Sequence, residues 1–249
     1  MSSIVIIPAR MASTRLPGKP LADIAGLPMI VRVWKCAVAA AIGPVAVAAG
    51  DVEIASAICQ AGGTAVLTSP ALPSGTDRVF AALESLDGKR EYETVVNLQG
   101  DLPLLDPEQL RRAVDTLATS GADIATLAAP IAEPRDCDNT NVVKPVIAWR
   151  EGELWGRALY FTRARAPHGD GTFYHHIGIY AFRREALERF VALPPSPLER
   201  RENLEQLRAL EAGMTIAVGR VDEVPLSVDT PADLESVRAA AVSSAAGNR

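Results

Sequence analysis

Three basic side chains crowd into the loop that follows the first apolar run of this chain, Ile4–Ile7. Arg10, Arg15 and Lys19 lie within ten residues of one another. Cations held this closely repel one another unless an anion lies among them, and a polyphosphate would meet that requirement. The spacing therefore predicts an anion-binding loop, and the alternative interpretation is a solvated basic loop with no ligand.

The same loop lacks the common nucleotide-binding motifs. No glycine precedes Gly18-Lys19 at the Walker A spacing, and Pro20 stands where that motif needs Ser or Thr. The glycine spacing of a dinucleotide-binding turn is also missing. These differences argue against P-loop kinases and the common dehydrogenases.

Two acidic residues follow predicted strands elsewhere in the chain. Asp101 ends the run Gln99-Gly100-Asp101 after an apolar strand, and Asp229 follows Val228. Mg²⁺ is commonly bound by one or two carboxylates together with substrate phosphates. The pair predicts a magnesium site, although each aspartate alone could be a turn residue or a helix N-terminal charge.

Three further segments carry polar groups whose roles the sequence leaves open. Ser74-Gly75-Thr76-Asp77-Arg78 precedes a helix and is either a capping turn, with Ser74 or Thr76 as the cap, or a backbone surface that reads a nucleobase. His176 and Tyr180 share a strand face with Gly178 by alternation and would suit sugar hydroxyls. Glu205-Gln206 is predicted within a helix, where the simplest interpretation is a solvent-facing pair.

The elements that must position these residues alternate between short apolar strands and longer helices. This alternation predicts an α/β fold, with a Rossmann-like, mostly parallel sheet and helices on both faces. The first predicted elements are, in order, 4–7, 29–41, 45–48, 53–61, 64–67, 77–86, 94–98, 107–120 and 124–129, with Asp106 capping the 107–120 helix.

The regular alternation loosens in the second half of the chain. We expect a β-rich excursion at about 130–182, with strands at 142–149, 157–161 and 177–182 and a turn at Glu151-Gly152. Helices are predicted at 184–193 and 198–211, a strand at 215–218, and a last helix at 231–242 capped by Thr230. Residues 1–249 are predicted to form a single domain, and the excursion is a candidate dimerisation surface.

Composition limits the classes of partner. The 249 residues are 48% hydrophobic and 22% charged, which is typical of a soluble globular protein. The net charge of −5 argues against a general binder of nucleic acid or anionic membranes, so an anionic partner needs a local cationic site. No membrane insertion or signal peptide is expected. The three separated cysteines favour a reduced, cytoplasmic compartment.

In combination these segments resemble the 3-deoxy-manno-octulosonate cytidylyltransferases, which activate the sugar acid Kdo, and the resemblance runs in order over nearly the whole chain. The His-Tyr strand with the Leu-Glu-Gln-Leu segment is specific to these enzymes. The matching segments are 6–10, 15–21, 74–78, 97–101, 141–144, 158–163, 176–180, 195–199, 204–208 and 228–231.

The resemblance implies a nucleotide-diphospho-sugar transferase-like fold and a set of site residues. CTP would be held by Ala9, Arg10, Ser13, Arg15, Lys19, Ser74, Gly75 and Arg78. Kdo would be surrounded by Gln99, His176, Tyr180, Glu205 and Gln206. Mg²⁺ would be bound by Asp101 and Asp229, and the catalytic residues would be Lys19, Arg10 and Asp101.

The implied reaction gives CMP-Kdo and pyrophosphate for lipopolysaccharide biosynthesis, and a homodimer is expected. Two alternatives stay open. The chain could activate another acidic sugar, such as 8-amino-Kdo or sialic acid, on the same fold, or it could be a nucleotide-binding module without turnover. Leu102 stands where many members carry an acidic or amide residue, which removes one group that could support a metal ion.

Overall fold

The computed structural model describes residues 2–12 and 16–247 of the chain. These residues form two compact units, which we treat separately. Unit 1 comprises Met1–Leu110 and Pro225–Arg249, and unit 2 comprises Arg111–Val224. Among the described helices, none combines the length and apolar composition that crossing a lipid bilayer requires. The single-domain organisation of the chain stays a prediction.

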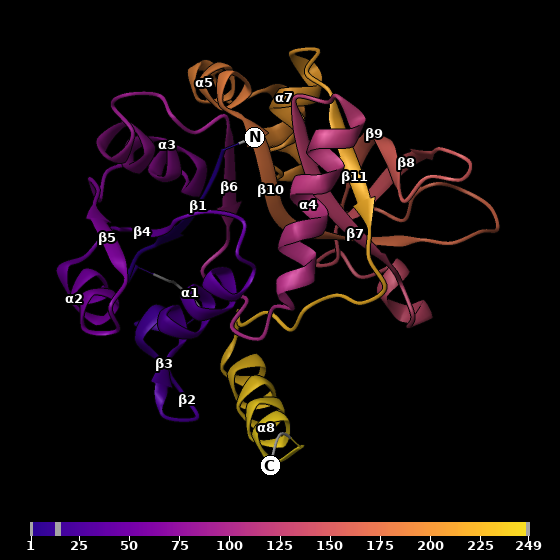
Figure 1. Cartoon of the computed structure of the whole chain (residues 1–249). Helices are drawn as coiled ribbons and strands as arrows, with labels where there is room; N and C mark the ends of the chain where they lie inside the picture. Colours follow the sequence, from indigo (N-terminus) through magenta and orange to yellow (C-terminus); the bar gives the residue numbers. More distant parts are fainter. Residues whose placement is uncertain (1, 13–15, 248–249) are drawn as a thin grey trace. The chain divides into compact units, whose positions relative to one another are not determined.

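The sheet of unit 1 is parallel, as the alternating pattern predicts. Its strands lie in the order β5-β4-β1-β6. Because right-handed crossovers are strongly preferred, the reversal of direction after β5 sends α3 to the face opposite α1 and α2 (Figure 1). The elements are β1 (Ser3–Ala9), α1 (Met29–Ala39), β4 (Val45–Ala49), α2 (Val52–Gln60), β5 (Thr64–Leu67), α3 (Gly75–Leu86) and β6 (Thr94–Leu98).

The C-terminal segment returns to unit 1 and completes it. Helix α8 (Pro231–Gly247) packs beside the short hairpin of β2 (Asp23–Ile24) and β3 (Leu27–Pro28), which follows the turn η1 (Lys19–Leu21). Their shared core contains Ile24, Met29, Val228, Leu234 and Val237. Thr230 Oγ1 accepts a hydrogen bond from the Asp233 amide at 3.2 Å, which confirms the predicted cap. This packing brings Asp229 next to the N-terminal loop.

Unit 2 holds a mixed sheet in the order β10-β7-β11-β9-β8, in which the neighbours β7 and β11 pair in parallel and the other described neighbours pair antiparallel. Its strands are β7 (Ile124–Pro130), β8 (Lys144–Trp149), β9 (Trp155–Thr162), β10 (Tyr174–Arg183) and β11 (Ile216–Arg220). Its helices are η2 (Pro134–Cys137), α5 (Arg184–Ala192), α6 (Pro197–Glu202) and α7 (Leu207–Glu211), and α4 (Pro107–Ser120) crosses from unit 1.

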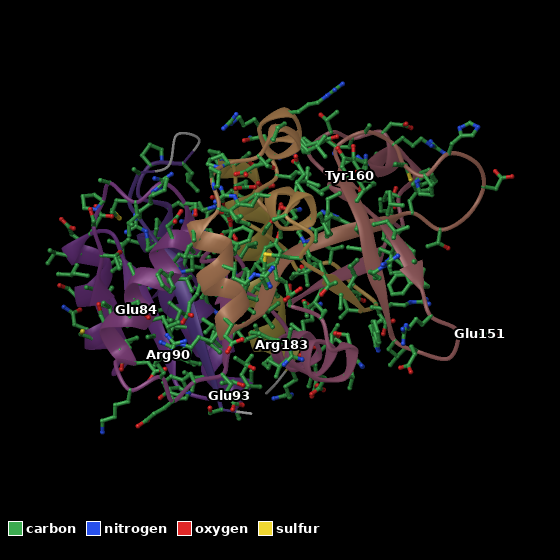
Figure 2. All side chains as sticks on the ribbon, turned by 90° about the horizontal axis from the view of Figure 1, so that it is seen from above. Glu84, Arg90, Glu93, Glu151, Tyr160 and Arg183 are labelled. Atoms are coloured by element: carbon green, nitrogen blue, oxygen red, sulfur yellow. The ribbon has the colours of Figure 1, made fainter. Side chains whose placement is uncertain are left out.

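The predicted excursion at about 130–182 lies within unit 2 and contains β8, β9 and most of β10. The predicted turn between β8 and β9 is confirmed, since Gly152 takes the left-handed φ of 76°. Figure 2 shows Glu151 at this turn. The predicted Asp106 cap of α4 is also confirmed, because Asp106 Oδ1 accepts from the Glu108 amide at 2.9 Å.

The prediction of one helix over 198–211 is wrong. Asn203 adopts the left-handed region at φ 55°, which asparagine tolerates better than most residues, and it ends α6. Glu205 and Gln206 therefore lie in the turn before α7 and not on a helix face. A capping box between Ser196 and Glu199 fixes the start of α6.

Candidate active site

A cavity of about 390 Å³ opens on unit 1 and collects most of the residues that the sequence singles out there. Its lining includes the predicted residues Ala9, Arg10, Lys19, Ser74, Gly75, Arg78, Gln99, Asp101 and Asp229. Ser13 and Arg15 lie outside the described residues. His176, Tyr180, Glu205 and Gln206 belong to unit 2.

The topology of the parallel sheet explains why these residues meet. Arg10 follows β1 and Asp101 follows β6, and the carboxyl ends of neighbouring parallel strands share one edge of the sheet. Gly100 allows the chains to approach closely, because a Cβ atom there would lie 3.0 Å from the Pro8 carbonyl oxygen. Leu102 is buried at 6% exposure, so it points into the protein interior.

The N-terminus of α3 forms one side of the cavity. Ser74 is its cap, and its hydroxyl accepts from the Asp77 amide at 3.1 Å, so one of the two predicted caps is confirmed. Gly75 begins the helix close to Pro8. A Cβ atom at Gly75 would lie 3.4 Å from Pro8 Cγ. The partial positive charge of a helix N-terminus favours an anion or a carbonyl acceptor at this side of the cavity.

Lys19 joins the two predicted metal ligands. Its ammonium lies 3.0 Å from Asp101 Oδ2 and 3.3 Å from Asp229 Oδ1, and it donates to the Val228 carbonyl at 2.6 Å. Both carboxylates are thus within reach of one cation. The structure reveals this bridging position of Lys19, whereas the sequence pattern associated the lysine with phosphate alone.

The carboxylate pair also fits a divalent cation. Aspartate oxygens are the hard ligands that Mg²⁺ prefers. No group of three or more His, Cys, Asp or Glu side chains converges on a common metal position in the described part of the chain. Asp101 and Asp229 would therefore need water or substrate phosphate to complete the coordination, which is the usual arrangement for magnesium at phosphoryl-transfer sites.

Asp51, which sequence reasoning missed, lies close enough to Arg78 to offset part of the cost of burying its charge. Arg78 is only 2% exposed and donates to Thr68 Oγ1 at 2.5 Å. Burial, followed by the repulsion of Arg10, lowers the pKa of Arg78, and the nearby carboxylate of Asp51 opposes that effect. Asp51 Oδ2 also accepts from the Met11 amide at 2.7 Å. The available signal was its position two residues after the end of β4 at Ala49.

Gln99 lines the same cavity and is held there by a series of side-chain hydrogen bonds. Its amide nitrogen donates to Asn97 Oδ1 at 3.1 Å, and Asn97 Nδ2 donates to Thr76 Oγ1 at 3.2 Å. Asn97 is fully buried, so this chain holds Gln99 rigidly. Unlike the other predicted Kdo residues, Gln99 lies in unit 1.

The remaining predicted sugar residues all lie in unit 2. The rings of His176 and Tyr180 are 5.6 Å apart, so the prediction that they share a face is confirmed, although the register of β10 against β7 shifts between them. Burial lowers the pKa of His176 to about 3, so the imidazole is neutral at physiological pH. Burial, with the charge of Glu205 second, raises the pKa of Tyr180, which stays protonated.

Gln206, the residue after Glu205, carries a buried amide. Its residue is 6% exposed, and its Nε2 has no hydrogen-bond partner among the described residues. A buried amide donor without a partner is costly, which favours a ligand acceptor at this position. The turn that carries it is fixed by Arg208, whose Nε and Nη2 donate to the two carboxylate oxygens of Glu199 at 2.8 and 2.5 Å.

A buried lysine, Lys144, fixes the segment that hydrogen-bonds to the backbone amide of His176. Sequence reasoning missed this role. Lys144 is fully buried and donates to the carbonyls of Asn139, Val142 and Arg163 at 2.7–2.8 Å. Burial lowers its pKa. The segment that it fixes accepts the His176 amide through Val143 O at 2.9 Å. Sequence pattern alone does not distinguish such a lysine from an exposed one.

Comparisons with known proteins agree on one family. The family sequence model described as Cytidylyltransferase matches residues 4–216. The 3-deoxy-manno-octulosonate cytidylyltransferase of Parvibaculum lavamentivorans is 63% identical over 95% of this chain and 92% of its own length. The enzyme of that name from Rhodospirillum rubrum is 60% identical over 95% of this chain and 94% of its own length.

A solved structure leads to the same family. CMP:2-keto-3-deoxy-manno-octonic acid synthetase complexed with CTP superposes with a TM-score of 0.90 at 36% identity, covering 98% of this chain and all of the other. This match confirms the α/β fold that the alternating pattern predicts. The chain belongs to the 3-deoxy-manno-octulosonate cytidylyltransferase family.

Proposed function

We propose that this protein transfers the cytidylyl group of CTP to Kdo and releases pyrophosphate. The observation that carries the proposal is the cavity of unit 1, where cations, a helix N-terminus and two convergent carboxylates meet. The anomeric hydroxyl of Kdo attacks the α-phosphorus, the bond from that phosphorus to the pyrophosphate oxygen breaks, and the hydroxyl proton passes to water. Such reactions depend mainly on positioning and on neutralisation of charge.

In this proposal the cavity holds CTP. Arg10 and Lys19 neutralise the phosphates, and Ser13 and Arg15 extend the same basic loop. Arg78 is held by Thr68 and Ser69, so it adds a fixed positive charge to the wall of the cavity. Ala9, Ser74 and Gly75 lie at the sheet edge and the start of α3, where backbone groups can contact the nucleotide.

We further propose that Asp101 and Asp229 bind Mg²⁺. When bound, the ion would supply positive charge to the phosphates and lower the pKa of an attacking hydroxyl. Lys19 would then donate to a phosphate oxygen as well as to the Val228 carbonyl. Isothermal titration of the protein with Mg²⁺ and a non-hydrolysable CTP analogue measures this binding, and no loss of affinity in Asp229→Asn would contradict it.

Kdo is proposed to contact the unit 2 residues that the family resemblance assigns to the sugar, His176, Tyr180, Glu205 and Gln206, and Gln99 of unit 1 stays a candidate sugar residue. The partnerless amide of Gln206 supports a ligand acceptor there, such as a sugar oxygen. Neutral His176 and protonated Tyr180 can exchange hydrogen bonds with hydroxyls, since neither is charged at neutral pH.

A pyrophosphate-release assay with CTP, Mg²⁺ and Kdo tests the proposal. Turnover is expected with Kdo and CTP and not with ATP or GTP. A higher kcat/KM for 8-amino-Kdo or sialic acid than for Kdo would replace the sugar assignment. CTP binding without pyrophosphate release from any sugar would identify a non-catalytic binding module.

The cellular setting is proposed from the same family membership. The protein would act in the cytoplasm as a homodimer and supply CMP-Kdo for lipopolysaccharide biosynthesis. Light scattering coupled to gel filtration measures the mass, and a monomer of 26.4 kDa at micromolar concentration would contradict the dimer. Cell fractionation with an antibody against the chain tests the compartment.

A further inference from the structure

His176 has a hydrogen-bond partner inside unit 2 that no sequence motif identifies. Thr126 of β7 is fully buried, and its Oγ1 lies 2.9 Å from His176 Nε2. The same hydroxyl lies 2.8 Å from the Ile179 carbonyl and 3.1 Å from the Ile177 carbonyl. The contact forms where the register of β10 against β7 is irregular, and such irregularities often re-aim side chains at functional sites.

The single hydrogen of the Thr126 hydroxyl determines which group donates in its contact with His176. A threonine hydroxyl has one hydrogen, and carbonyl oxygens only accept. If the hydroxyl donated to His176, its lone pairs would face two carbonyl oxygens, which is repulsive. The stable arrangement has Thr126 donating to a carbonyl, with Ile179 O the nearer, and accepting from Nε2–H of the imidazole.

We propose that Thr126 is a positioning residue that fixes His176 as the Nε2–H tautomer, so that Nδ1 presents a lone pair to a hydroxyl group of the acidic sugar. A neutral imidazole in this form accepts a hydrogen bond at Nδ1 and has no proton there to give to a carboxylate. His176 thus recognises a hydroxyl of the substrate and not its acid group. This assignment rests on the proposed function for the identity of the ligand, but the tautomer itself does not.

The tautomer can be measured directly. The chain has only three histidines, so ¹⁵N-histidine labelling gives a simple spectrum in which His176 is assigned by its absence in His176→Gln. In the ligand-free wild-type protein we expect Nε2 at the shift of a protonated nitrogen and Nδ1 at that of an unprotonated one. The reverse pattern would overturn the proposal, whatever the outcome of the activity assay.

Variants of Thr126 link the tautomer to substrate binding. Thr126→Val keeps the shape and removes the acceptor, and we expect mixed tautomers with a KM for Kdo raised about tenfold, while the KM for CTP stays within twofold. Thr126→Ser restores the hydroxyl and should restore both readouts. Thr116→Val removes another buried threonine hydroxyl of unit 2 and should change neither.

The outcomes separate the possible failures. Unchanged ¹⁵N shifts in Thr126→Val, or equal rises in KM for both substrates, would contradict the positioning role. If Thr126→Val does not fold, the wild-type spectrum and Thr126→Ser still decide the tautomer. If the wild-type protein shows the expected tautomer but no turnover with Kdo, the proposed sugar fails and the role of Thr126 stands.

Discussion

Replacing Lys19 by methionine should lower turnover far more than it lowers stability. The substitution keeps a stem of similar length and removes an ammonium that contacts Asp101, Asp229 and the Val228 carbonyl. Loss of one preorganised electrostatic donor to a developing charge costs about 3 kcal/mol, or roughly a hundredfold in turnover. We therefore expect kcat to fall about a hundredfold at saturating CTP, Kdo and Mg²⁺.

The effect of the same change on folding is expected to be small. The side chains of Asp101 and Asp229 are 28% and 45% exposed, so water replaces much of the lost interaction. Pairs of this exposure contribute about 1 kcal/mol or less, which corresponds to a shift of about 2–4 °C in a protein of this size. Thermal unfolding followed by circular dichroism measures this shift.

Lys35→Met provides the matched control. It makes the same change of charge and volume on an exposed face of α1, and it should leave kcat within twofold. Pyrophosphate release is the assay for both variants. If Lys19→Met keeps at least half of the wild-type kcat, or if its loss of activity parallels a large fall in melting temperature, the charge argument is refuted.

Three other perturbations test separate parts of the site. Asp101→Asn should remove most Mg²⁺-dependent pyrophosphate release, and full activity in that variant or in excess chelator would contradict metal binding by Asp101. His176→Ala should raise the KM for Kdo and leave the KM for CTP nearly unchanged, and equal changes in both would contradict its assignment to the sugar. Burial lowers the pKa of His176 from 6.5 to about 3, so the unfolded state takes up a proton at this residue before the folded state does as the pH falls. The free energy of unfolding should therefore decrease by about 2 kcal/mol between pH 7 and pH 5 through this residue. Denaturant unfolding at both pH values measures the loss, which should be smaller in His176→Asn, and equal losses would contradict the burial argument.

Local pattern predicted the regular elements well because the driving forces are local. The buried strands of unit 1 are mostly apolar, and β6 is predicted with its observed limits. Helix α4 was also predicted from Pro107 to Ser120, since proline at the first position and an aspartate cap mark its start. The helix over 198–211 failed because one left-handed residue, Asn203, breaks a sequence that is otherwise favourable for helix.

The contacts within the site were less accessible to sequence reasoning. Lys19 and Asp229 meet only because α8 packs on the β2–β3 hairpin, and the two residues are far apart in the sequence. Thr126 and Lys144 act through backbone carbonyls, whose positions depend on strand register and loop conformation. Propensity and periodicity contain no information on such geometry. The resemblance to a family suggested the site residues, but not which of them contact one another.

The charge of the whole chain and the charge of its cavity have opposite signs, and this difference explains how an acidic protein can bind a polyphosphate. The net charge is −5, yet the described lining of the cavity carries three cations, Arg10, Lys19 and Arg78, against the carboxylates of Asp101 and Asp229. Lys19 keeps those carboxylates from repelling each other in the free protein. A triphosphate that draws the ammonium toward itself would leave the pair undercompensated, and a divalent cation would restore the balance. Nucleotide and magnesium should therefore bind with positive coupling. Lys19→Met should weaken that coupling, because in the variant the carboxylates of Asp101 and Asp229 lack a compensating cation even before the nucleotide binds.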